Sequence, residues 1–346
     1  MEWMKALVFY GPGDIRLEKH KIPVIRQEEM LIRVKAAGVC GTDIRIYNGT
    51  KEIEAPRIIG HEFAGDIIAV GKCVKNFAAG ERVTVYPIIT CNDCYTCKTG
   101  RTNICPERIT LGYELDGGFA EYVRIPANAI ANGNVNRLPS GVSYEEGAVS
   151  EPLTAAYSGI RRANVKTGNS VLIVGGGPIG LLHTQLSKLY GAGLIIVSEP
   201  QKEKRLQAKF FGADAAVDPL NESLQKLIDK MTGGAGMDIV IADVGVPEIV
   251  EKSVEYVKRG GKYVIFAGCP AGSRITIDPN QIHYKELVIT GSSAAKPTYQ
   301  RKILKMIAAG QVDVKTVISD VFPVERWQEA FNMKENYKGL KYVLTF

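Results

Sequence analysis

The hydrophobic pattern of the chain changes near residue 155. Before that point, short apolar or alternating runs are separated by turn-forming Gly, Pro and Asn residues. Alternation with a period of two, broken by frequent turns, predicts short β-strands. We expect strands at residues 5–10, 30–37, 62–70 and 82–85. The N-terminal region is therefore predicted to be rich in strands and loops.

From about residue 155, compact apolar runs alternate with segments that suit helices. This alternation predicts a parallel sheet with right-handed helical crossovers. The expected strands are 170–174, 194–198, 215–217, 238–242, 262–267 and 286–289. The expected helices are 179–190, 202–211, 224–231 and 248–258, followed in the tail by 299–309 and 324–332. The predicted fold class is α/β, with a β-rich domain and a doubly wound parallel sheet.

Composition places the chain among globular proteins. Its 346 residues suggest about two domains, and 45% of them are hydrophobic and 23% charged. Lys and Arg exceed Asp and Glu by 43 to 37, a diffuse excess that does not indicate nucleic-acid binding. Neither a signal peptide nor a long apolar run is evident, so we expect a cytoplasmic protein without a membrane span.

A glycine-rich turn follows the expected strand 170–174. Gly175, Gly177 and Gly180 fit the G-x-G-x-x-G pattern, and Pro178 and Ile179 open the next helix. Glycines at these places allow a tight turn, close approach of a pyrophosphate, and close packing of the helix on the strand. The helix N-terminus would attract the phosphates. This context favours a dinucleotide site over a glycine turn without a ligand.

The residue at the end of the next strand bears on whether NAD or NADP is bound. Glu199 stands there, 19 residues after Gly180, where a carboxylate would bind the ribose hydroxyls. A carboxylate repels the 2′-phosphate of NADP, which favours NAD, although the nearby Lys204 and Arg205 keep NADP open. We predict further cofactor contacts at Ala267, Gly291 and Ser292.

Four of the seven cysteines form one cluster. Cys91, Cys94, Cys97 and Cys105 could complete the tetrahedral shell of a zinc ion and leave no open position, as structural sites do. A chain of this size needs no disulfide scaffold. An iron–sulfur cluster, a redox pair and a nucleic-acid zinc module are alternatives. They are disfavoured by the spacing, by the number of thiols and by the few basic neighbours, respectively.

A second group of metal-binding side chains lies nearer the N-terminus. Cys40, His61 and Glu62 could form a three-ligand zinc site with an open position. The spacing alone leaves ordinary core or surface roles open for each of them.

Together, these motifs resemble the zinc-dependent medium-chain alcohol dehydrogenase family. The resemblance covers essentially the whole chain and rests on Cys40–Asp43, Gly60–Val74, the four-cysteine loop, Gly80–Val83, Asp116–Tyr122, Glu151-Pro152 and the glycine motif. It implies a GroES-like catalytic domain over residues 1–154, completed by 291–346. It also implies an NAD-binding Rossmann domain over residues 155–290.

Within the family, the chain resembles the sorbitol (polyol) and threonine dehydrogenase branch. Glu151 stands where simple-alcohol members carry a cysteine. The resemblance implies that Cys40, His61 and Glu62 bind a catalytic zinc ion, with Glu151 binding directly or through water. Together with the cysteine cluster, this gives two zinc ions per chain.

Two further positions bear on the proton released in the reaction. Thr42 matches a family position whose hydroxyl begins a proton relay. Many members carry histidine where this chain has Arg45, and arginine is a poor proton acceptor. Arg45 could instead bind an anionic substrate or form a surface salt bridge.

The resemblance implies NAD-dependent oxidation of a secondary hydroxyl of a sorbitol- or iditol-like polyol to a ketone. L-Threonine, butanediol and sugar phosphates are alternative substrates. From other classes, a non-catalytic NAD- and zinc-binding relative and a zinc-ribbon nucleic-acid binder are alternatives. We expect a homotetramer with a small-molecule substrate and no nucleic-acid or membrane partner.

Overall fold

The computed structural model describes residues 2–346, which form two compact units. The first unit ends at Thr154 and resumes with Ala294–Phe346, and the second is Ala155–Ser293. The C-terminal tail thus shares a unit with the N-terminal region. The second unit ends three residues beyond the domain limit of 290 that we expected from the sequence.

The first unit contains mostly short strands. They are β1 (Trp3–Gly11), β2 (Asp14–Lys21), β3 (Met30–Val39), β4 (Arg57–Ile58), β5 (Glu62–Val70), β6 (Arg82–Val85), β7 (Ile88–Ile89), β8 (Ile109–Thr110), β9 (Tyr122–Ile125), β10 (Val135–Arg137), β17 (Ile318–Pro323) and β18 (Lys341–Thr345). Its helices are α1 (Gly41–Tyr47), α2 (Tyr95–Lys98), α3 (Ala127–Ala131), α10 (Pro297–Ala308) and α11 (Trp327–Glu335), with 3₁₀ turns at Thr102–Ile104 and Val324–Arg326. Helix α4 (Tyr144–Ala163) begins in this unit and ends in the second.

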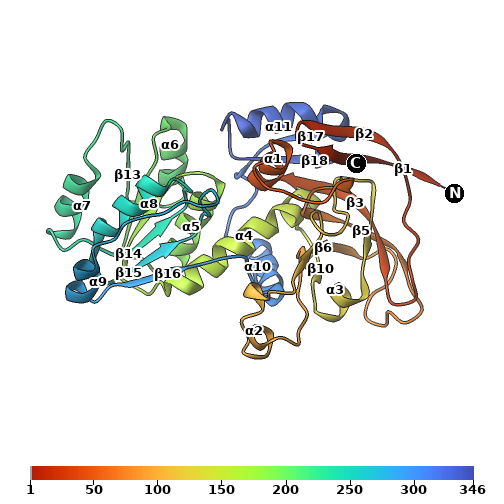
Figure 1. Ribbon diagram of the computed structural model, residues 1–346, viewed down its shortest axis with the longest axis horizontal. Coiled ribbons are helices and arrows are strands. Elements are labelled where there is room, and N and C mark those ends of the chain that lie inside the picture. Colours follow the sequence, from red (N-terminus) through yellow and green to blue (C-terminus); the bar gives the residue numbers. More distant parts are fainter. Residues whose placement is uncertain (1) are drawn as a thin grey trace. The chain divides into compact units, whose positions relative to one another are not determined.

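Seven strands of the first unit form one sheet. Its order is β10-β6-β5-β3-β18-β17, and β9 also pairs with β3. Smaller sheets have the orders β2-β1-β4 and β7-β8. The blue C-terminal strand β18 lies beside the N-terminal β3 in Figure 1, and the two pair in antiparallel register. This pairing brings the last residues of the chain to the end of β3, close to Cys40.

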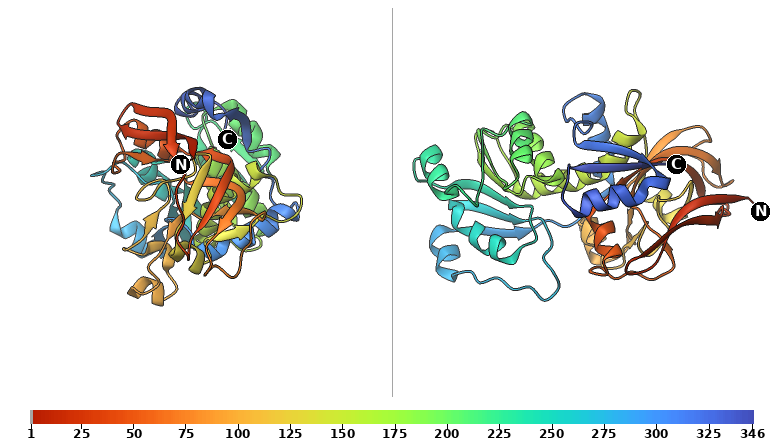
Figure 2. Two further views of the ribbon diagram at one scale, coloured as in Figure 1. Left: turned by 90° about the vertical axis from the view of Figure 1, so that its right-hand side faces the viewer. Right: turned by 90° about the horizontal axis from the view of Figure 1, so that it is seen from above.

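The second unit is a six-stranded parallel sheet. Its strands are β11 (Ser170–Val174), β12 (Leu194–Ser198), β13 (Ala215–Val217), β14 (Met237–Ala242), β15 (Val257–Ile265) and β16 (Val288–Gly291). Its helices are α5 (Pro178–Leu189), α6 (Lys202–Phe210), α7 (Leu224–Thr232), α8 (Pro247–Ser253) and α9 (Pro279–Lys285), with a 3₁₀ turn at Val254–Tyr256. Helices cover both faces of the sheet (Figures 1 and 2).

The strand order of this sheet is β13-β12-β11-β14-β15-β16. Numbered from β11, this is the 3-2-1-4-5-6 order of the Rossmann fold, in which ligands bind where the order reverses, between the first and fourth strands. All five residues of β11 are buried, as expected for a strand covered on both faces.

Several sequence predictions were wrong at the level of single elements. The expected helix 248–258 ends earlier, because β15 already begins at Val257. The expected strand 262–267 ends at Ile265, and the strand expected at 286–289 is Val288–Gly291. The region before residue 155, expected to be rich in strands and loops, also contains most of the 20-residue helix α4.

Candidate active site and metal centres

Cys40 lies at the junction of β3 and α1. Strand β3 ends at Val39, and Cys40 is the N-cap of α1. The backbone N–H of Cys40 donates to Oδ2 of Asp43 at 2.8 Å, and the N–H of Asp43 donates to the Cys40 carbonyl at 3.1 Å. An acidic side chain at the third helical position that bonds back to the N-cap is a capping box. The cap therefore holds the Cys40 backbone in a defined position.

Strand pairing brings His61 and Glu62 to the same place. In the register of β3 with β5, Gly38 lies opposite Glu62. Donor atoms of Cys40, His61 and Glu62 all lie within 4.8 Å of one another, although twenty residues of the chain lie between Cys40 and His61. The imidazole and the carboxylate are buried, and Cys40 is half-buried. The structure thus assembles the three residues that the sequence singled out.

Asp43 and Tyr113 flank the imidazole of His61. Oδ1 of Asp43 lies 3.4 Å from Nδ1 of His61, and the Tyr113 hydroxyl lies 3.5 Å from the same nitrogen. A carboxylate at one ring nitrogen orients the other toward a metal, as in carboxylate–histidine–zinc arrangements. Burial lowers the pKa of His61, but the neighbouring Tyr113 and the Asp43 carboxylate raise it by more, so that the pKa lies well above its usual value. The surroundings of His61 therefore favour a cation.

Glu62 forms a buried ion pair with the C-terminal strand. The Lys341 ammonium, at the start of β18, lies 2.5 Å from both carboxylate oxygens of Glu62. Both side chains are almost fully buried. Burial lowers the pKa of Lys341, but the Glu62 charge raises it, so that the pKa lies above its usual value. Lys341 therefore compensates the charge of Glu62.

Glu151 and Thr42 lie outside the group of three mutually close donors. Glu151 is on α4, and its carboxylate is not among the donors that lie within 4.8 Å of one another. Burial and the charge of Glu62 raise the pKa of Glu151 to about 7, so the two carboxylates share one electrostatic environment. Thr42 is in the first turn of α1, two residues after Cys40. Direct binding of zinc by Glu151 and a relay through Thr42 stay predictions.

The donor set fits a zinc ion. A thiolate, an imidazole and a carboxylate are typical zinc ligands, and three protein ligands leave a position for a substrate. Oδ1 of the buried Asp43 has no hydrogen bond within the described residues, and it lies 3.4 Å from Nδ1 of His61, so its charge faces the donor group.

The four clustered cysteines also converge. Their sulfur atoms lie 3.5 Å (Cys91–Cys105), 3.8 Å (Cys94–Cys105) and 4.0 Å (Cys91–Cys97) apart, and all four thiols are free. A tetrahedral zinc ion with Zn–S bonds of about 2.3 Å separates its sulfur ligands by roughly 3.8 Å. Hydrogen bonds from Thr96 and from the Cys97 backbone lower the pKa of Cys94 to about 6. The cluster fits a closed, four-thiolate zinc site.

The glycine loop lies where the Rossmann strand order reverses. Gly175 follows β11 with a positive φ of 110°. A Cβ on Gly180 would lie 1.9 Å from the Gly175 carbonyl oxygen, so only glycine fits there. A Cβ on Gly177, the N-cap of α5, would meet no atom within 4 Å, which leaves room for a phosphate. Pro178 and Ile179 form the first turn of α5. The described loop therefore has the space and the helix N-terminus that a pyrophosphate needs.

Glu199 bonds directly to this loop. Its Oε2 accepts the N–H of Gly176 at 2.8 Å, and its Oε1 accepts the N–H of Gln201 at 2.9 Å. Lys204 is buried, and burial lowers its pKa against the opposing charge of Glu199. The Arg205 guanidinium donates to the carbonyls of Glu199 and Pro200 and forms an ion pair with Asp218 at 3.2 Å.

Three more residues predicted to bind the cofactor also follow strands of this sheet. The N–H of Ala267, just after β15, donates to the Ala242 carbonyl at 3.1 Å. Gly291 ends β16, and the Ser292 N–H donates to Ile265 at 3.1 Å. The carboxyl ends of parallel strands lie at one edge of a sheet, so Ala267, Gly291 and Ser292 share this edge with Gly175.

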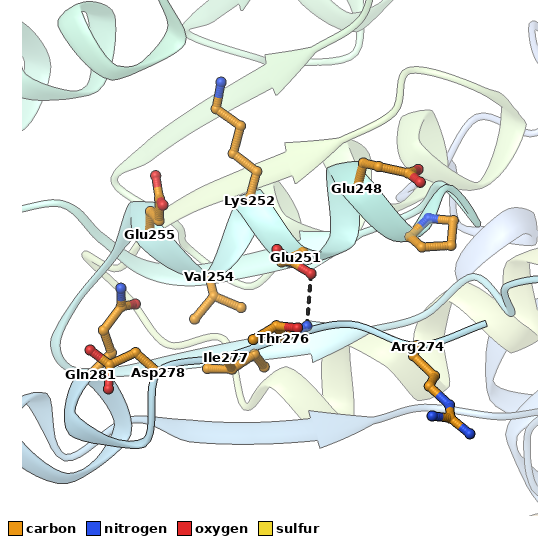
Figure 3. A pocket seen from close by; sticks show the side chains of 11 residues that line it. Glu248, Glu251, Lys252, Val254, Glu255, Arg274, Thr276, Ile277, Asp278 and Gln281 are labelled. Atoms are coloured by element: carbon orange, nitrogen blue, oxygen red, sulfur yellow. Dashed lines mark hydrogen bonds between the residues drawn. The ribbon is translucent and has the colours of Figure 1, made fainter.

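One surface pocket lies away from all of these residues. It has a volume of about 250 Å³ and is lined by α8, the 3₁₀ turn after it, and residues 274–281 (Figure 3). The Thr276 N–H donates to Glu251 across it at 2.7 Å. None of the predicted metal or cofactor residues lines this pocket, so it carries no part of the site described here.

Some neighbours of the metal donors were missed by sequence reasoning. Asp43 lies in the quoted Cys40–Asp43 motif, and its position three residues after an N-cap could have revealed its role. Lys341 has no local signal, because its partner Glu62 lies 279 positions away. Tyr113 lies 52 positions from His61 in the chain, and the Lys51 ammonium lies 3.2 Å from the centre of the Tyr113 ring; neither contact has a local sequence signal.

Two units with these strand orders and donor groups define a two-domain protein of the dehydrogenase type, with a dinucleotide loop in one unit and metal donors in the other. The chain matches the family models "Alcohol dehydrogenase GroES-like domain" over residues 26–135 and "Zinc-binding dehydrogenase" over residues 178–309. It belongs to the zinc-dependent medium-chain alcohol dehydrogenase family, and the predicted fold class is confirmed.

Relatives in this family match the chain over nearly its whole length. It is 33% identical to a sorbitol dehydrogenase of Bacillus subtilis, over 97% of this chain and 95% of the relative. It is 30% identical to an L-galactonate-5-dehydrogenase of Escherichia coli, over the full length of both. The crystal structure of a zinc-binding dehydrogenase from Sinorhizobium meliloti bound to NADP superimposes with a TM-score of 0.91, at 31% identity and full coverage of both chains.

Within residues 2–346, no helix has the length and apolar character needed to cross a membrane. The expectations of a cytoplasmic location and of a homotetramer stay predictions.

Proposed function

We propose that this protein is an NAD-dependent zinc dehydrogenase that oxidises a secondary hydroxyl of a polyol-like substrate to a ketone. The observation that carries the proposal is the convergence of Cys40, His61 and Glu62, with Glu151 sharing their electrostatic environment. Relatives named for sorbitol and L-galactonate support a polyhydroxylated substrate.

The residues of the first unit would hold the metal and orient the substrate. Zinc, when bound by Cys40, His61 and Glu62, supplies a Lewis acid that lowers the pKa of a bound hydroxyl. Oδ1 of Asp43 lies 3.4 Å from Nδ1 of His61, and its charge would orient the ring so that Nε2 faces the metal. Lys341 limits the negative charge of Glu62. The Thr42 hydroxyl would take up the proton that leaves the substrate.

The residues of the second unit would hold the nucleotide. The nicotinamide supplies the hydride acceptor, and oxidation of the alcohol yields a ketone, NADH and one proton. The N-terminus of α5 and Gly177 would receive the pyrophosphate. The Glu199 carboxylate would accept the ribose hydroxyls and disfavour a 2′-phosphate. Ala267, Gly291 and Ser292 would contact the cofactor from the neighbouring strand ends.

A substrate panel tests the proposal. The zinc-loaded protein is incubated with NAD and, in separate assays, with sorbitol, iditol, galactitol, L-threonine and 2,3-butanediol, and NADH absorbance is followed. We expect turnover with a polyol and none in a Cys40→Ala variant. Saturable NAD binding without oxidation of any alcohol, at full zinc occupancy, would instead identify a non-catalytic relative.

A further inference from the structure

The ammonium of Lys51 lies one aromatic ring away from the metal donors. Its Nζ is 3.2 Å from the centre of the Tyr113 ring, a close cation–π contact. The Tyr113 ring centre is 5.2 Å from that of His61. Adding the 3.2 Å and 5.2 Å separations, the ammonium lies no more than 8.4 Å from the His61 ring centre. A cation is therefore held within a short distance of the place where a hydroxyl would be oxidised.

The backbone fixes the position of this lysine. The N–H groups of Thr50 and Lys51 both donate to the Arg45 carbonyl at the end of α1, at 2.8 and 2.9 Å. Cys40 is the N-cap of α1, directly before its first residue. A single short segment thus carries a metal donor at one end and the Lys51 ammonium at the other.

The Lys51 ammonium lacks a carboxylate partner. Among the described residues, no hydrogen bond from this group and no carboxylate within 4.0 Å is found, although the side chain is half-buried. Burial lowers the pKa of Lys51 to about 8, and the charge of Arg45 lowers it as well, while Cys40, Glu114 and Asp43 oppose the shift. A partly desolvated cation without a counter-ion is stabilised when an anion binds to it.

Tyr113 and Lys51 are more exposed to solvent than His61 is. His61 is only 5% exposed, whereas Tyr113 and Lys51 are half-buried. Arg45 is exposed and adds a second positive charge beside Lys51. The cation thus lies on the solvent side of the metal donors, where the part of a substrate remote from the reacting carbon would lie.

We propose that Lys51 is a specificity-determining residue that binds the carboxylate or phosphate of an anionic, polyhydroxylated substrate. This proposal rests on the proposed dehydrogenase function and narrows its substrate class to sugar acids or polyol phosphates. The neutral end of the substrate would carry the hydroxyl to be oxidised, and the anionic end would meet Lys51, with Arg45 contributing long-range attraction.

Matched substrates and variants test this inference by turnover. Galactitol, L-galactonate and galactitol 1-phosphate share a carbon chain and differ in charge, and sorbitol, gluconate and sorbitol 6-phosphate form a second set. In the zinc-loaded enzyme with NAD, we expect kcat/KM to be highest for one anionic member. Lys51→Met should lower that value about 10–100-fold, mainly through KM, because a lost charge-assisted hydrogen bond is worth about 1.5–3 kcal/mol. The kcat/KM values for galactitol and sorbitol should change less than about threefold, because these substrates carry no charge.

Controls separate a lost charge from a damaged site. Lys51→Arg should restore most of the preference, and Lys19→Met, at an exposed position on β2, should leave it unchanged. The effect of Lys51 should weaken with added salt. A higher kcat/KM for the sugar acid identifies a carboxylate as the anionic group, and a higher kcat/KM for the polyol phosphate identifies a phosphate. Equal losses for neutral and anionic substrates in Lys51→Met, or no loss at all, would overturn the inference.

Calorimetric titration measures binding without turnover. Gluconate and sorbitol 6-phosphate are titrated into the zinc-loaded protein and into Lys51→Met. If no polyhydroxylated compound is oxidised but one anion binds the protein and not Lys51→Met, the result contradicts the proposed function and supports the anion site. If neutral polyols are oxidised and the binding of neither anion depends on Lys51, the result supports the proposed function and contradicts the anion site.

Discussion

Lys341 and Glu62, which lie 279 positions apart, form a buried ion pair in which the ammonium is 2.5 Å from both carboxylate oxygens. The pair exists because β18 returns to the end of β3, opposite the start of β5. It links the C-terminal strand to a predicted zinc ligand, so that the stability of this unit and its metal affinity should depend on each other.

Lys341→Met should destabilise the zinc-free protein by about 3–5 kcal/mol, because an unpaired carboxylate is left buried. In the zinc-loaded protein the decrease in the free energy of unfolding should be smaller, because the metal would supply a second cation to Glu62. Urea unfolding of both forms measures the difference, with Lys341→Arg as the control that keeps the charge. An equal loss in both forms would show that Glu62 does not meet the metal.

The same ion pair explains why a glycine, Gly38, occupies its position on β3. A Cβ on Gly38 would lie 2.2 Å from Oε2 of Glu62 and 3.2 Å from Cε of Lys341. Gly38→Ala should therefore displace the pair, lower the free energy of unfolding by about 1–3 kcal/mol and reduce zinc occupancy. Gly41→Ala is the matched control, because a Cβ there meets nothing within 4 Å. Thermal unfolding and metal analysis check both variants, and unchanged zinc content in Gly38→Ala would contradict the expectation.

Asp43 offers a test of how the imidazole is oriented. Asp43→Asn keeps an oxygen that can accept the Cys40 N–H but removes the charge facing His61. Loss of such an outer partner typically costs 10–100-fold in metal affinity or activity, and we expect a loss in this range. Competition with a chelator measures zinc affinity, and Asp14→Asn, in a surface ion pair with Arg16, serves as the control. Equal zinc affinity in both variants would exclude an orienting role.

Local patterns predicted most elements of the second unit, although the bounds of α8, β15 and β16 differ from those expected, and they missed one long helix of the first. The strands 170–174 and 194–198 and the glycine loop were predictable, because fully buried strands and their turns leave strong local signals. Helix α4 was missed because Pro152 and two glycines interrupt its pattern. The Lys341–Glu62 pair has no local signal, since strand pairing alone creates it.

The cysteines provide a test by metal removal. Cys40→Ala should reduce zinc from two ions per chain to one and abolish oxidation, with little change in Tm. Cys97→Ala, in the buried part of the other cluster, should also leave one ion but lower Tm by about 2–4 °C for each kcal/mol of stability lost, because a structural zinc contributes folding energy. Cys73→Ala, exposed and outside both clusters, should keep both ions. A single zinc ion in the unmodified protein would refute the two-site arrangement.

Glu199 should decide between the two nicotinamide nucleotides. Its carboxylate faces the glycine loop through the Gly176 N–H, whereas Arg205 is engaged by Asp218 and two carbonyls. Glu199→Gln should lower kcat/KM for NAD about 10–100-fold, since hydrogen bonds to a charged group are worth about 1.5–3 kcal/mol, and should leave NADP unchanged or improved. Glu203→Gln, exposed on the following helix, controls for loss of charge. If Glu199 only braced the loop, both nucleotides would lose equally, and the ratio of their kcat/KM values separates the two roles.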